Sequence, residues 1–468
     1  MSMAFQVKTV PSRWIVNDGY RLDCGAYLSG VFETRELLQK FTTEPLHSIT
    51  SGIFHAGRES RVWVDSADYG VPFLSNTDIH ALDISRLPYM SKKQVRSKSN
   101  LILREGWSLI TRSGATGRMA YSRSDMDGKA CSEHVMRVVP NEMKVKPGYI
   151  YAFLSSRFGI PIIVSGTYGS IIQRIEPQHL VDLPVPRLGT VEQEAHDLVQ
   201  QAAELRVEAN SMVKEAAGQY LKAANIQDIS PNYWLDNSGK GSFVTPVSKT
   251  SLRAMNYIPL NAQLAIMIKE RSDKWLPLID VVEESTLRSV PHFKRVDSEH
   301  EFGVELIGQS ECFSSRPSGR WISRKHLPND KLLFPPDGTI MIAAQVCAGE
   351  TDLFGRAQFI TGKFLNYAYS HHFLRVIGNE SVMPRGALFA FIMSEISYRI
   401  RKGFQTGSMQ QDFHLGMMKS MPIPIIDYDA AKEIDTFVKY AYQKRDRAID
   451  CEDQARSLVE RAIEDGGQ

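Results

Sequence analysis

Leu183-Pro184-Val185-Pro186 and the run that follows it, Val191 to Leu221, decide the fold of this 468-residue chain. Apolar or small residues recur in this run every three or four positions: Val191, Ala195, Leu198, Ala202, Leu205, Ala209, Met212 and Ala216. That spacing predicts a long helix with a heptad seam. The two prolines favour an extended segment just before it, so the helix begins at a defined place.

The same pattern returns near the end of the chain, where Met421-Pro422-Ile423-Pro424 precedes a second run. Its seam positions are Ala430, Ile434, Phe437, Ala441, Lys444, Ala448, Cys451, Ala455, Leu458 and Ala462. Alanine at so many seam positions favours close pairing of the two helices. The alternative is two amphipathic helices that lie separately on a globular core.

Further blocks repeat at an offset of 238 residues, which indicates that one unit is written twice. The matching blocks are Ser132-Glu133-His134 with Ser370-His371-His372, Tyr151-Ala152-Phe153-Leu154 with Phe389-Ala390-Phe391-Ile392, Gly169-Ser170 with Gly407-Ser408, and, at an offset of 233, Gly70-Val71 with Gly303-Val304. Short alternating runs and compact apolar runs predict strands within each unit, and helices become more frequent toward its end. We therefore predict an α+β chain with two tandem mixed α/β units.

Composition is that of an ordinary globular protein, with 43% hydrophobic and 23% charged residues. No apolar run approaches the roughly 18 residues that a membrane span needs, and no signal peptide is recognisable, so we expect a cytoplasmic protein without membrane contact. None of the five cysteines forms a Cys-x-x-Cys pair, which argues against a disulfide framework and against a zinc site. We expect buried thiols at Cys24, Cys131, Cys312, Cys347 and Cys451.

The net charge of +2 hides an uneven distribution along the chain. Residues 190–225 and 426–468, which contain the predicted helices, hold 10 Lys and Arg against 17 Asp and Glu, whereas the remaining residues hold 45 against 36. The predicted globular parts are therefore basic, as expected of a surface that binds a polyanion.

Clusters of basic residues within the two units are candidate DNA contacts. Residues 86–123 contain nine Lys and Arg but one acid, Glu105. Lysine suits phosphate contacts, whereas arginine and the amides can also reach base edges. The candidates are Lys92, Lys93, Arg96, Lys98, Arg112 and Arg118 in the first unit, and Arg288, Lys294, Arg295, Arg320, Arg324 and Lys325 in the second. The alternative for each of them is a solvated charged surface.

The repeated Gly-Ser loops are a second kind of candidate, because a glycine lets backbone N–H groups approach a phosphate closely. Their candidate residues are Ser170, Gln173 and Arg174 in the first loop, and Ser408, Gln410 and Gln411 in the second. A structural turn explains these loops equally well.

No enzymatic motif is convincing. The chain lacks the Asn/Asp-Pro-Pro-Tyr/Phe tetrapeptide of adenine methyltransferases, a Gly-rich cofactor loop and a P-loop. Asp125 or Asp127 with Glu142 and Lys144 could imitate the metal-binding site of a nuclease, but the second unit has no copy of it. His134, His371 and His372 have no carboxylate or cysteine at ligand spacing. We predict no catalytic and no metal-binding residue.

The order of these parts, taken twice, resembles the specificity subunits of Type I restriction-modification systems. The resemblance rests on Gly169-Ser170-Ile171-Ile172-Gln173, on Leu183-Pro184-Val185-Pro186-Arg187-Leu188, and on Glu192-Gln193 just beyond. The second copy lacks the Glu-Gln pair, since Ile425-Ile426-Asp427-Tyr428-Asp429 stands there. The resemblance covers nearly the whole chain.

This resemblance implies target recognition domains at 1–189 and 228–425, each reading half of a bipartite double-stranded DNA target. Conserved helices at 190–227 and 426–468 would pair antiparallel as a spacer and dock methyltransferase subunits, expected to number two. Those partners would hold S-adenosylmethionine and methylate adenine, so that this chain itself needs no cofactor. A restriction or translocase subunit is a further candidate partner. The competing interpretations are a defence-type DNA endonuclease and a coiled-coil scaffold.

Overall fold

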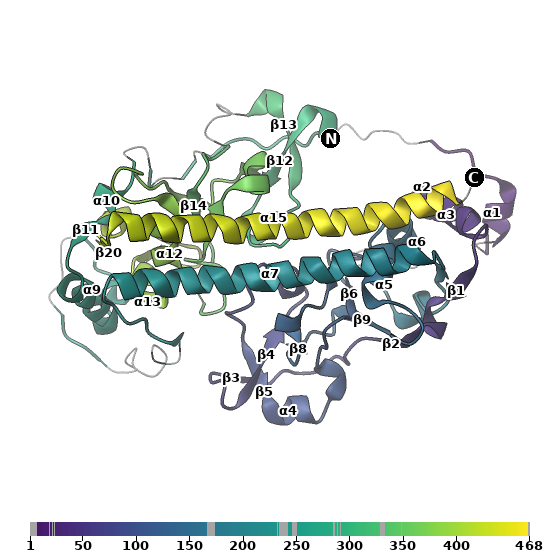
Figure 1. The fold of residues 1–468 in the computed structure, drawn as a ribbon, viewed down its shortest axis with the longest axis horizontal. Helices are drawn as coiled ribbons and strands as arrows, with labels where there is room; N and C mark the ends of the chain where they lie inside the picture. Colours follow the sequence, from purple (N-terminus) through teal and green to yellow (C-terminus); the bar gives the residue numbers. More distant parts are fainter. Residues whose placement is uncertain are drawn as a thin grey trace. The chain divides into compact units, whose positions relative to one another are not determined.

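The computed structural model describes residues 7–466 without 18, 21, 23, 166–173, 232, 234–241, 246–249, 284, 285, 288, 291, 328–332 and 348. The chain forms two compact units, unit 1 (Met1–Val207 with Arg447–Gln468) and unit 2 (Glu208–Asp446). Each unit mixes small sheets with helices (Figure 1), and the predicted α+β class is confirmed. Among the described residues, no helix is both long and apolar enough to span a bilayer.

Two four-stranded sheets form the centre of unit 1. The first has the order β2-β9-β6-β7, with all neighbours antiparallel, and the second has the order β3-β5-β4-β8, in which β4 and β8 are parallel. The strands are β2 (Thr50–Phe54), β3 (Trp63–Val64), β4 (Gly70–Leu74), β5 (Tyr89–Ser91), β6 (Ser108–Thr111), β7 (Met119–Tyr121), β8 (Ala130–Cys131) and β9 (Val135–Pro140).

The helices of unit 1 pack on one apolar core with the first of these sheets. They are α1 (Ser12–Asn17), α2 (Cys24–Leu28), α3 (Val31–Leu38), α5 (Pro147–Leu154) and α6 (Gly159–Ser165), while α4 (Lys92–Arg96) lies beside β4 and β5. Strand β10 (Pro184–Pro186) pairs antiparallel with β1 (Thr43–Pro45). The Pro-x-Pro segment is therefore extended, as predicted, before the long helix begins.

Unit 2 repeats this plan with two three-stranded sheets, β13-β12-β16 and β15-β14-β17. β11 (Trp275–Pro277) pairs with β20 (Pro422–Pro424) as β1 pairs with β10. β12 lies between antiparallel β13 and parallel β16, as β4 lies between β5 and β8. The elements are β12 (Gly303–Ile307), β13 (Arg320–Ser323), β14 (Thr339–Ala343), β15 (Ala357–Ile360), β16 (Ala368–Tyr369), β17 (Phe373–Val376), α9 (Pro259–Arg271), α10 (Leu278–Val281), α11 (Gln309–Cys312), α12 (Arg385–Met393), α13 (Glu395–Lys402) and α14 (Leu415–Lys419). The predicted duplication is confirmed.

The two long helices are α7 (Thr190–Ala223) and α15 (Tyr428–Asp465), teal and yellow in Figure 1. In unit 2, Glu208 near the middle of α7 pairs with Lys444 near the middle of α15 (2.9 Å). Tyr220, near the end of α7, donates its hydroxyl to the carbonyl of Pro424, just before α15 begins (2.6 Å). The two helices therefore run in opposite directions. In unit 1, a seam cluster of small and apolar residues comprises Ala202, Ala448 and Cys451 with Leu198 and Leu205.

A second buried row runs beside the predicted seam of α7 and was not predicted. It contains Val199, Ala203, Arg206, Asn210, Val213, Ala217 and Tyr220. Two members of the row are polar and have partners on α15: Arg206 forms an ion pair with Glu452 in unit 1, and Asn210 accepts from Arg445 in unit 2 (2.9 Å). The helix pair therefore combines small apolar residues with buried polar pairs.

The cysteine prediction was partly wrong, because Cys24 and Cys347 are exposed while the other three are buried. Burial raises the pKa of the Cys131 thiol to about 11. The boundary between the units falls near the middle of both long helices, after Val207 in α7 and after Asp446 in α15. The domain boundaries inferred from the sequence stay a prediction.

Candidate nucleic-acid interface

The predicted basic residues after β5 and β13 occupy equivalent positions in the two units. Both strands are antiparallel neighbours of the strand that also pairs with the parallel strand β8 or β16. Lys92 and Lys93 begin α4 directly after β5, and Arg324 and Lys325 begin a short 3-10 helix, Arg324–His326, directly after β13. We call these the basic segments.

The first basic residue of each segment binds backbone and the second faces solvent. Lys92 Nζ donates to the carbonyl of Asp68 (2.8 Å), and Arg324 Nε donates to the carbonyl of Gly303 (3.1 Å). The lysine that follows each of them is exposed. Each segment therefore holds a lysine at a fixed place with its ammonium group in water.

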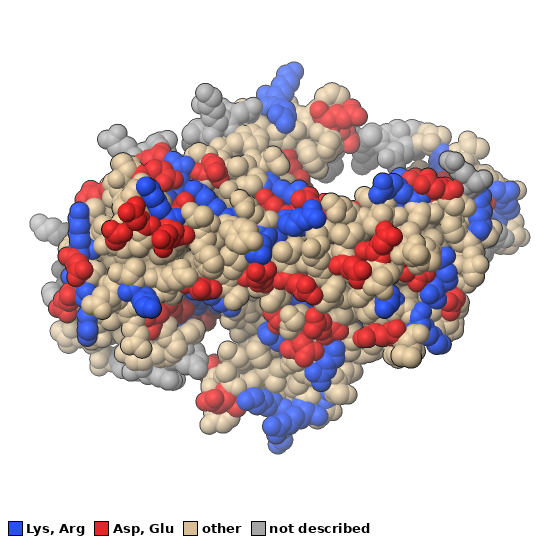
Figure 2. Space-filling view, in the orientation of Figure 1, with Lys and Arg blue, Asp and Glu red and all other residues tan. Residues whose placement is uncertain are grey.

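Figure 2 shows Lys and Arg gathered over α4 of unit 1. Arg96, at the end of α4, is exposed. Two other candidates are partly neutralised, because Lys98 forms an ion pair with Glu59 and Arg320 forms one with Asp297. The hydrogen bond from Arg320 lowers the pKa of Asp297. In and just after α4, the uncompensated positive charge therefore lies on Lys93 and Arg96 more than on Lys98.

The remaining basic candidates are spread over the units. Arg118 and Lys294 are exposed. Arg288 and the first-loop candidates Ser170 and Gln173 lie outside the described residues. Their predicted roles stay predictions.

The second Gly-Ser loop is the tip of a β-hairpin, β18 (Gln405–Gly407) and β19 (Gln411–Phe413). Gly407 has φ 96°, which favours glycine at the turn. Ser408 and Gln410 are exposed at the tip, whereas Gln411 is buried, exchanges backbone hydrogen bonds with Val346 and donates its amide to the carbonyl of Ser408. The structural-turn interpretation therefore accounts for Gln411, and the two exposed residues stay candidate contacts.

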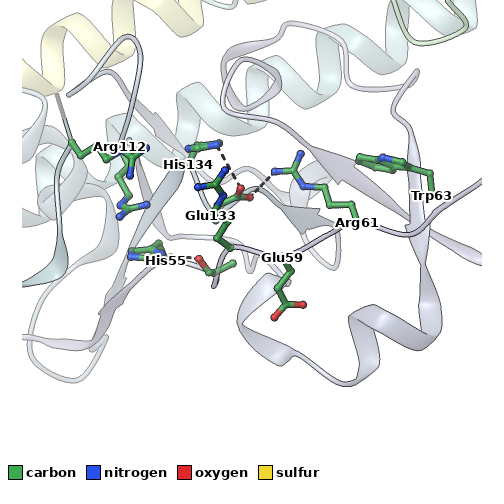
Figure 3. A pocket seen from close by; sticks show the side chains of 10 residues that line it. His55, Glu59, Arg61, Trp63, Arg112, Glu133 and His134 are labelled. Atoms are coloured by element: carbon green, nitrogen blue, oxygen red, sulfur yellow. Dashed lines mark hydrogen bonds and ion pairs between the residues drawn. The ribbon is translucent and has the colours of Figure 1, made fainter. Parts of the chain in front are cut away.

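A hollow of about 540 Å³ opens in unit 1, and arginine dominates its lining. Its charged residues are Arg58, Arg61, Arg112 and Arg174 against Glu59 and Glu133. Three aromatic or imidazole side chains, Trp63, His55 and His134, also line it (Figure 3). The positive excess suits an anionic ligand, and the exposed indole of Trp63 offers a ring face.

Two of the predicted residues meet at the wall of this hollow. Arg112 is buried and donates from Nε to the carbonyl of Ile175 (2.9 Å) and from Nη2 to Glu176. The next residue, Ser113, forms an isolated bridge with Arg174. Arg112 is therefore a structural residue that holds Arg174 at the hollow.

Each unit also contains what we call an arginine-turn site. In unit 1 the turn is Ser132-Glu133-His134, after β8, and Arg61 Nη2 donates to Glu133 Oε2 (2.5 Å; Figure 3). In unit 2 the turn is Ser370-His371-His372, after β16, and Arg295 Nη2 lies 3.3 Å from His371 Nδ1.

Strand register shows that the two arginines are equivalent. Arg61 precedes by two residues Trp63, which pairs with Met90 of β5. Arg295 precedes by two residues Asp297, which bridges to Ile322 of β13. The same geometry has therefore been kept in both copies, although the intervening segments differ in length.

A buried arginine donates hydrogen bonds to backbone carbonyls at or next to each turn. Arg137 of β9 is fully buried and donates to the carbonyls of Cys131 (2.7 Å) and Ser132 (2.9 Å). Its counterpart Arg375 of β17 donates to the carbonyl of Tyr369 (3.2 Å). Hydrogen bonds to charged donors are stronger than neutral ones, so these contacts fix the turns.

Side chains beyond the end of the neighbouring strand fix the last histidine of each turn. Ser113 Oγ lies 2.8 Å from His134 Nδ1, and Gln345 Oε1 lies 2.9 Å from His372 Nδ1. A hydrogen bond therefore holds His372 within its own unit. Among the described residues, no group of three His, Cys, Asp or Glu side chains could hold a metal ion.

The residues of the nuclease alternative are engaged separately. Asp125 accepts from Arg123 (3.0 Å), and Asp127 accepts from the backbone N–H of Glu105 (3.2 Å). Lys144 donates to the carbonyl of Ser48 (2.8 Å). Asp125, Asp127 and Glu142 are not part of any group among the described residues that could hold a metal ion.

Sequence reasoning missed Arg61, Arg58 and Glu133, although a signal for two of them was present. The turn containing Glu133 had been matched to the turn containing His371, and Arg295 was already a candidate. Because the offset between Arg61 and Arg295 is 234 and not 238, indels obscured their equivalence. Aligning the flanking strands first would have found it.

The comparisons with known proteins give fold neighbours at low similarity. No family model and no curated protein matches the sequence. A Type-I restriction-modification system S subunit from M. genitalium is 11% identical, with 90% of this chain and 95% of that chain covered and a TM-score of 0.33. An HsdS subunit from Thermoanaerobacter tengcongensis is 11% identical (91% and 96% covered, TM-score 0.27). A chain from a study of assembly and conformational transition in the type I R-M system is 10% identical (90% and 97% covered, TM-score 0.27).

Proposed function

We propose that this chain is the DNA sequence-specificity subunit of a Type I restriction-modification complex and that it has no catalytic site of its own. Each unit would read one half of a bipartite target in double-stranded DNA. The methyltransferase subunits would supply S-adenosylmethionine and the methyl transfer to adenine.

The observation that carries this proposal is the duplication of a basic surface. Each unit has one basic segment and one arginine-turn site, in equivalent positions of the same strand plan. A scaffold protein would have no need to keep these charges twice. Paired readers that contact separate stretches of a polyanion would need both.

The surface of the long helices supports a different partner for them. Figure 2 shows Asp and Glu along this part of the molecule, which disfavours DNA. Tyr440 of α15 is 51% exposed and lies beside the partly buried Phe437. Exposed tyrosines are typical of protein interfaces. We propose that this surface docks a methyltransferase subunit.

Selection of DNA by the whole purified chain tests the proposal. A pool of duplexes with random sequence is bound, recovered and sequenced, in parallel with a cleavage assay in magnesium. Two enriched half-sites at a fixed separation are expected, with no cleavage. Magnesium-dependent cutting would favour the nuclease alternative, and failure to retain any duplex would favour the scaffold.

The exposed charges of α4 should contact phosphates. Changing Lys93 and Arg96 together to Ala is expected to weaken binding to every duplex and to lower the salt slope by up to about 0.9 per lost contact. The measurement is log Kd against log salt concentration. The control, Lys214→Ala with Lys222→Ala, removes the same charge from exposed positions of α7 and should leave the slope unchanged. Equal slopes for both variants would remove α4 from the interface.

The two units should be separable readers. Exchanging residues 1–189 for the corresponding part of a protein with the same architecture is expected to change one selected half-site and to leave the other intact. Repeating the duplex selection with the chimaera measures this. A chimaera that changes both half-sites, or neither, would contradict independent reading.

A further inference from the structure

The two arginine-turn sites differ at the residue that faces the arginine. This residue is Glu133 in unit 1 and His371 in unit 2, at the same place in the turn. A carboxylate only accepts hydrogen bonds, whereas an imidazole can also donate them. The two sites therefore offer different hydrogen-bond patterns to a ligand.

In unit 1 the Arg61 side chain is held in place, but some of its N–H donors have no partner among the described residues. Besides its contact with Glu133, the Arg61 guanidinium lies 4.8 Å over the Phe73 ring, and 29% of its side chain is exposed. Its Nη2 donates to Glu133 Oε2 and, at 3.4 Å, to Ser132 Oγ, whereas Nε and Nη1 have no hydrogen-bond partner among the residues that the structure describes. Nη1 carries two N–H donors and Nε one, so three of the five guanidinium donors are open to a ligand.

The carboxylate beside it is kept ionised. Burial raises the pKa of Glu133, but the hydrogen bond and charge of Arg61 outweigh this effect, and the net pKa is lowered. Glu133 Oε1 lies 3.5 Å from His134 Nε2, so its two oxygen atoms face different neighbours. The site presents an acceptor directly beside a donor fork.

This pattern matches one base pair. In the major groove, guanine offers two acceptors, O6 and N7, to the fork of an arginine, and its partner cytosine offers the N4 amino donor to a carboxylate. We propose that Arg61 and Glu133 read one G·C pair, with Arg61 on the guanine and Glu133 on the cytosine. This inference rests on the proposed function and names its base-reading residues.

The site in unit 2 has a donor but no carboxylate. Burial, with the nearby His372, His292 and Arg295, lowers the pKa of His371 to about 4, so the ring is neutral at pH 7. Its Nδ1 faces Arg295, which leaves Nε2–H as a further donor in this tautomer. Arg295 would therefore bind a guanine, but no carboxylate of this turn would accept a hydrogen bond from the N4 amino group of the paired cytosine.

Base analogues within the selected target test the proposal with the whole chain. Each guanine of the unit 1 half-site is replaced in turn by 7-deazaguanine, which removes the N7 acceptor. One position is expected to lose about tenfold in affinity with the unchanged protein. With Arg61→Ala or Arg61→Met, the same replacement should cost less than about twofold, because neither side chain has a donor for N7.

Arg58→Ala is the matched control, since Arg58 is an exposed arginine of the same hollow. It should weaken binding to all duplexes yet keep the tenfold penalty. For the carboxylate, cytosine opposite that guanine is replaced by 2-pyrimidinone, which lacks the amino group. This change should cost the unchanged protein about tenfold more than it costs Glu133→Ala, and the equivalent change in the unit 2 half-site should show no such difference.

The outcomes separate this inference from the proposed function. If no bipartite target is selected, the proposed function fails. If a bipartite target is selected but the 7-deazaguanine penalty persists in both Arg61 variants, base reading by Arg61 is overturned. If the Arg61 variants lose only salt slope and no base preference, the arginine contacts phosphate, and the inference is likewise overturned.

Discussion

Glu452→Ala is expected to destabilise unit 1 by about 3–5 kcal/mol, because it leaves a buried guanidinium without its carboxylate. Arg206 and Glu452 are 6% and 3% exposed and form an ion pair between α7 and α15. The Tyr151 hydroxyl also points to Glu452 (3.5 Å). The measurement is urea unfolding followed by a signal from unit 1, with the slope m compared to check that the transition keeps its character.

Two controls separate burial from charge. Glu208→Ala removes the exposed partner of Lys444, and we expect a loss of at most about 1 kcal/mol. Replacing both members of the buried pair, Arg206→Met with Glu452→Leu, should recover most of the stability, since no charge is then left buried. If Glu452→Ala were as mild as Glu208→Ala, the pair would not be buried in solution.

The buried polar pairs explain why the helices could be predicted only in part. The seam was readable because small and apolar residues recur at fixed spacing. Arg206 and Asn210 fall beside that seam, and a charged or amide residue in a helix is most simply assigned to solvent. Their burial depends on partners on α15, more than 200 residues away in sequence. Spacing within one helix carries no information on such partners.

The same limit applies to the candidate interface. The stripe from Arg86 to Arg123 was recognised by its charge, yet Arg112 and Arg123 are buried against Glu176 and Asp125. Charge density along the sequence cannot separate these structural arginines from the exposed residues of α4. The repeat is the better guide, because it identifies positions that two copies of one fold have both kept. The 238-residue offset alone aligned the turn Ser132-Glu133-His134 with the turn Ser370-His371-His372.

Four residues inserted after Gln201 are expected to lengthen the preferred spacer between the half-sites by about two base pairs. If the paired helices set the distance between the readers, four residues add about 6 Å of rise, close to two base-pair steps of about 3.4 Å. They also rotate the following part of α7 by about 40° relative to the original seam. A four-residue insertion is a stutter, which a coiled coil absorbs by local unwinding.

Small side chains lie on both helices next to the insertion site. Cys451 Sγ donates to Gln201 Oε1 (3.2 Å), and Ala202 packs against Ala448 and Cys451. Because the side chains are small where α7 contacts α15 here, the insertion breaks few side-chain contacts. The buried ion pair of Arg206 begins only one turn later, so unfolding must be measured beside binding.

Binding to a set of duplexes that differ only in spacer length gives the answer. The control is a four-residue insertion after Met409, at the exposed tip of the β18–β19 hairpin, which lies outside both long helices. It should leave the spacer optimum unchanged. A change in a DNA-contacting residue would alter the preferred half-site sequence. A change in the length of the helix pair would alter only the preferred spacer length, so the two effects can be distinguished in one experiment. A folded α7 insertion that keeps the original optimum would show that the distance between half-sites is set elsewhere in the protein.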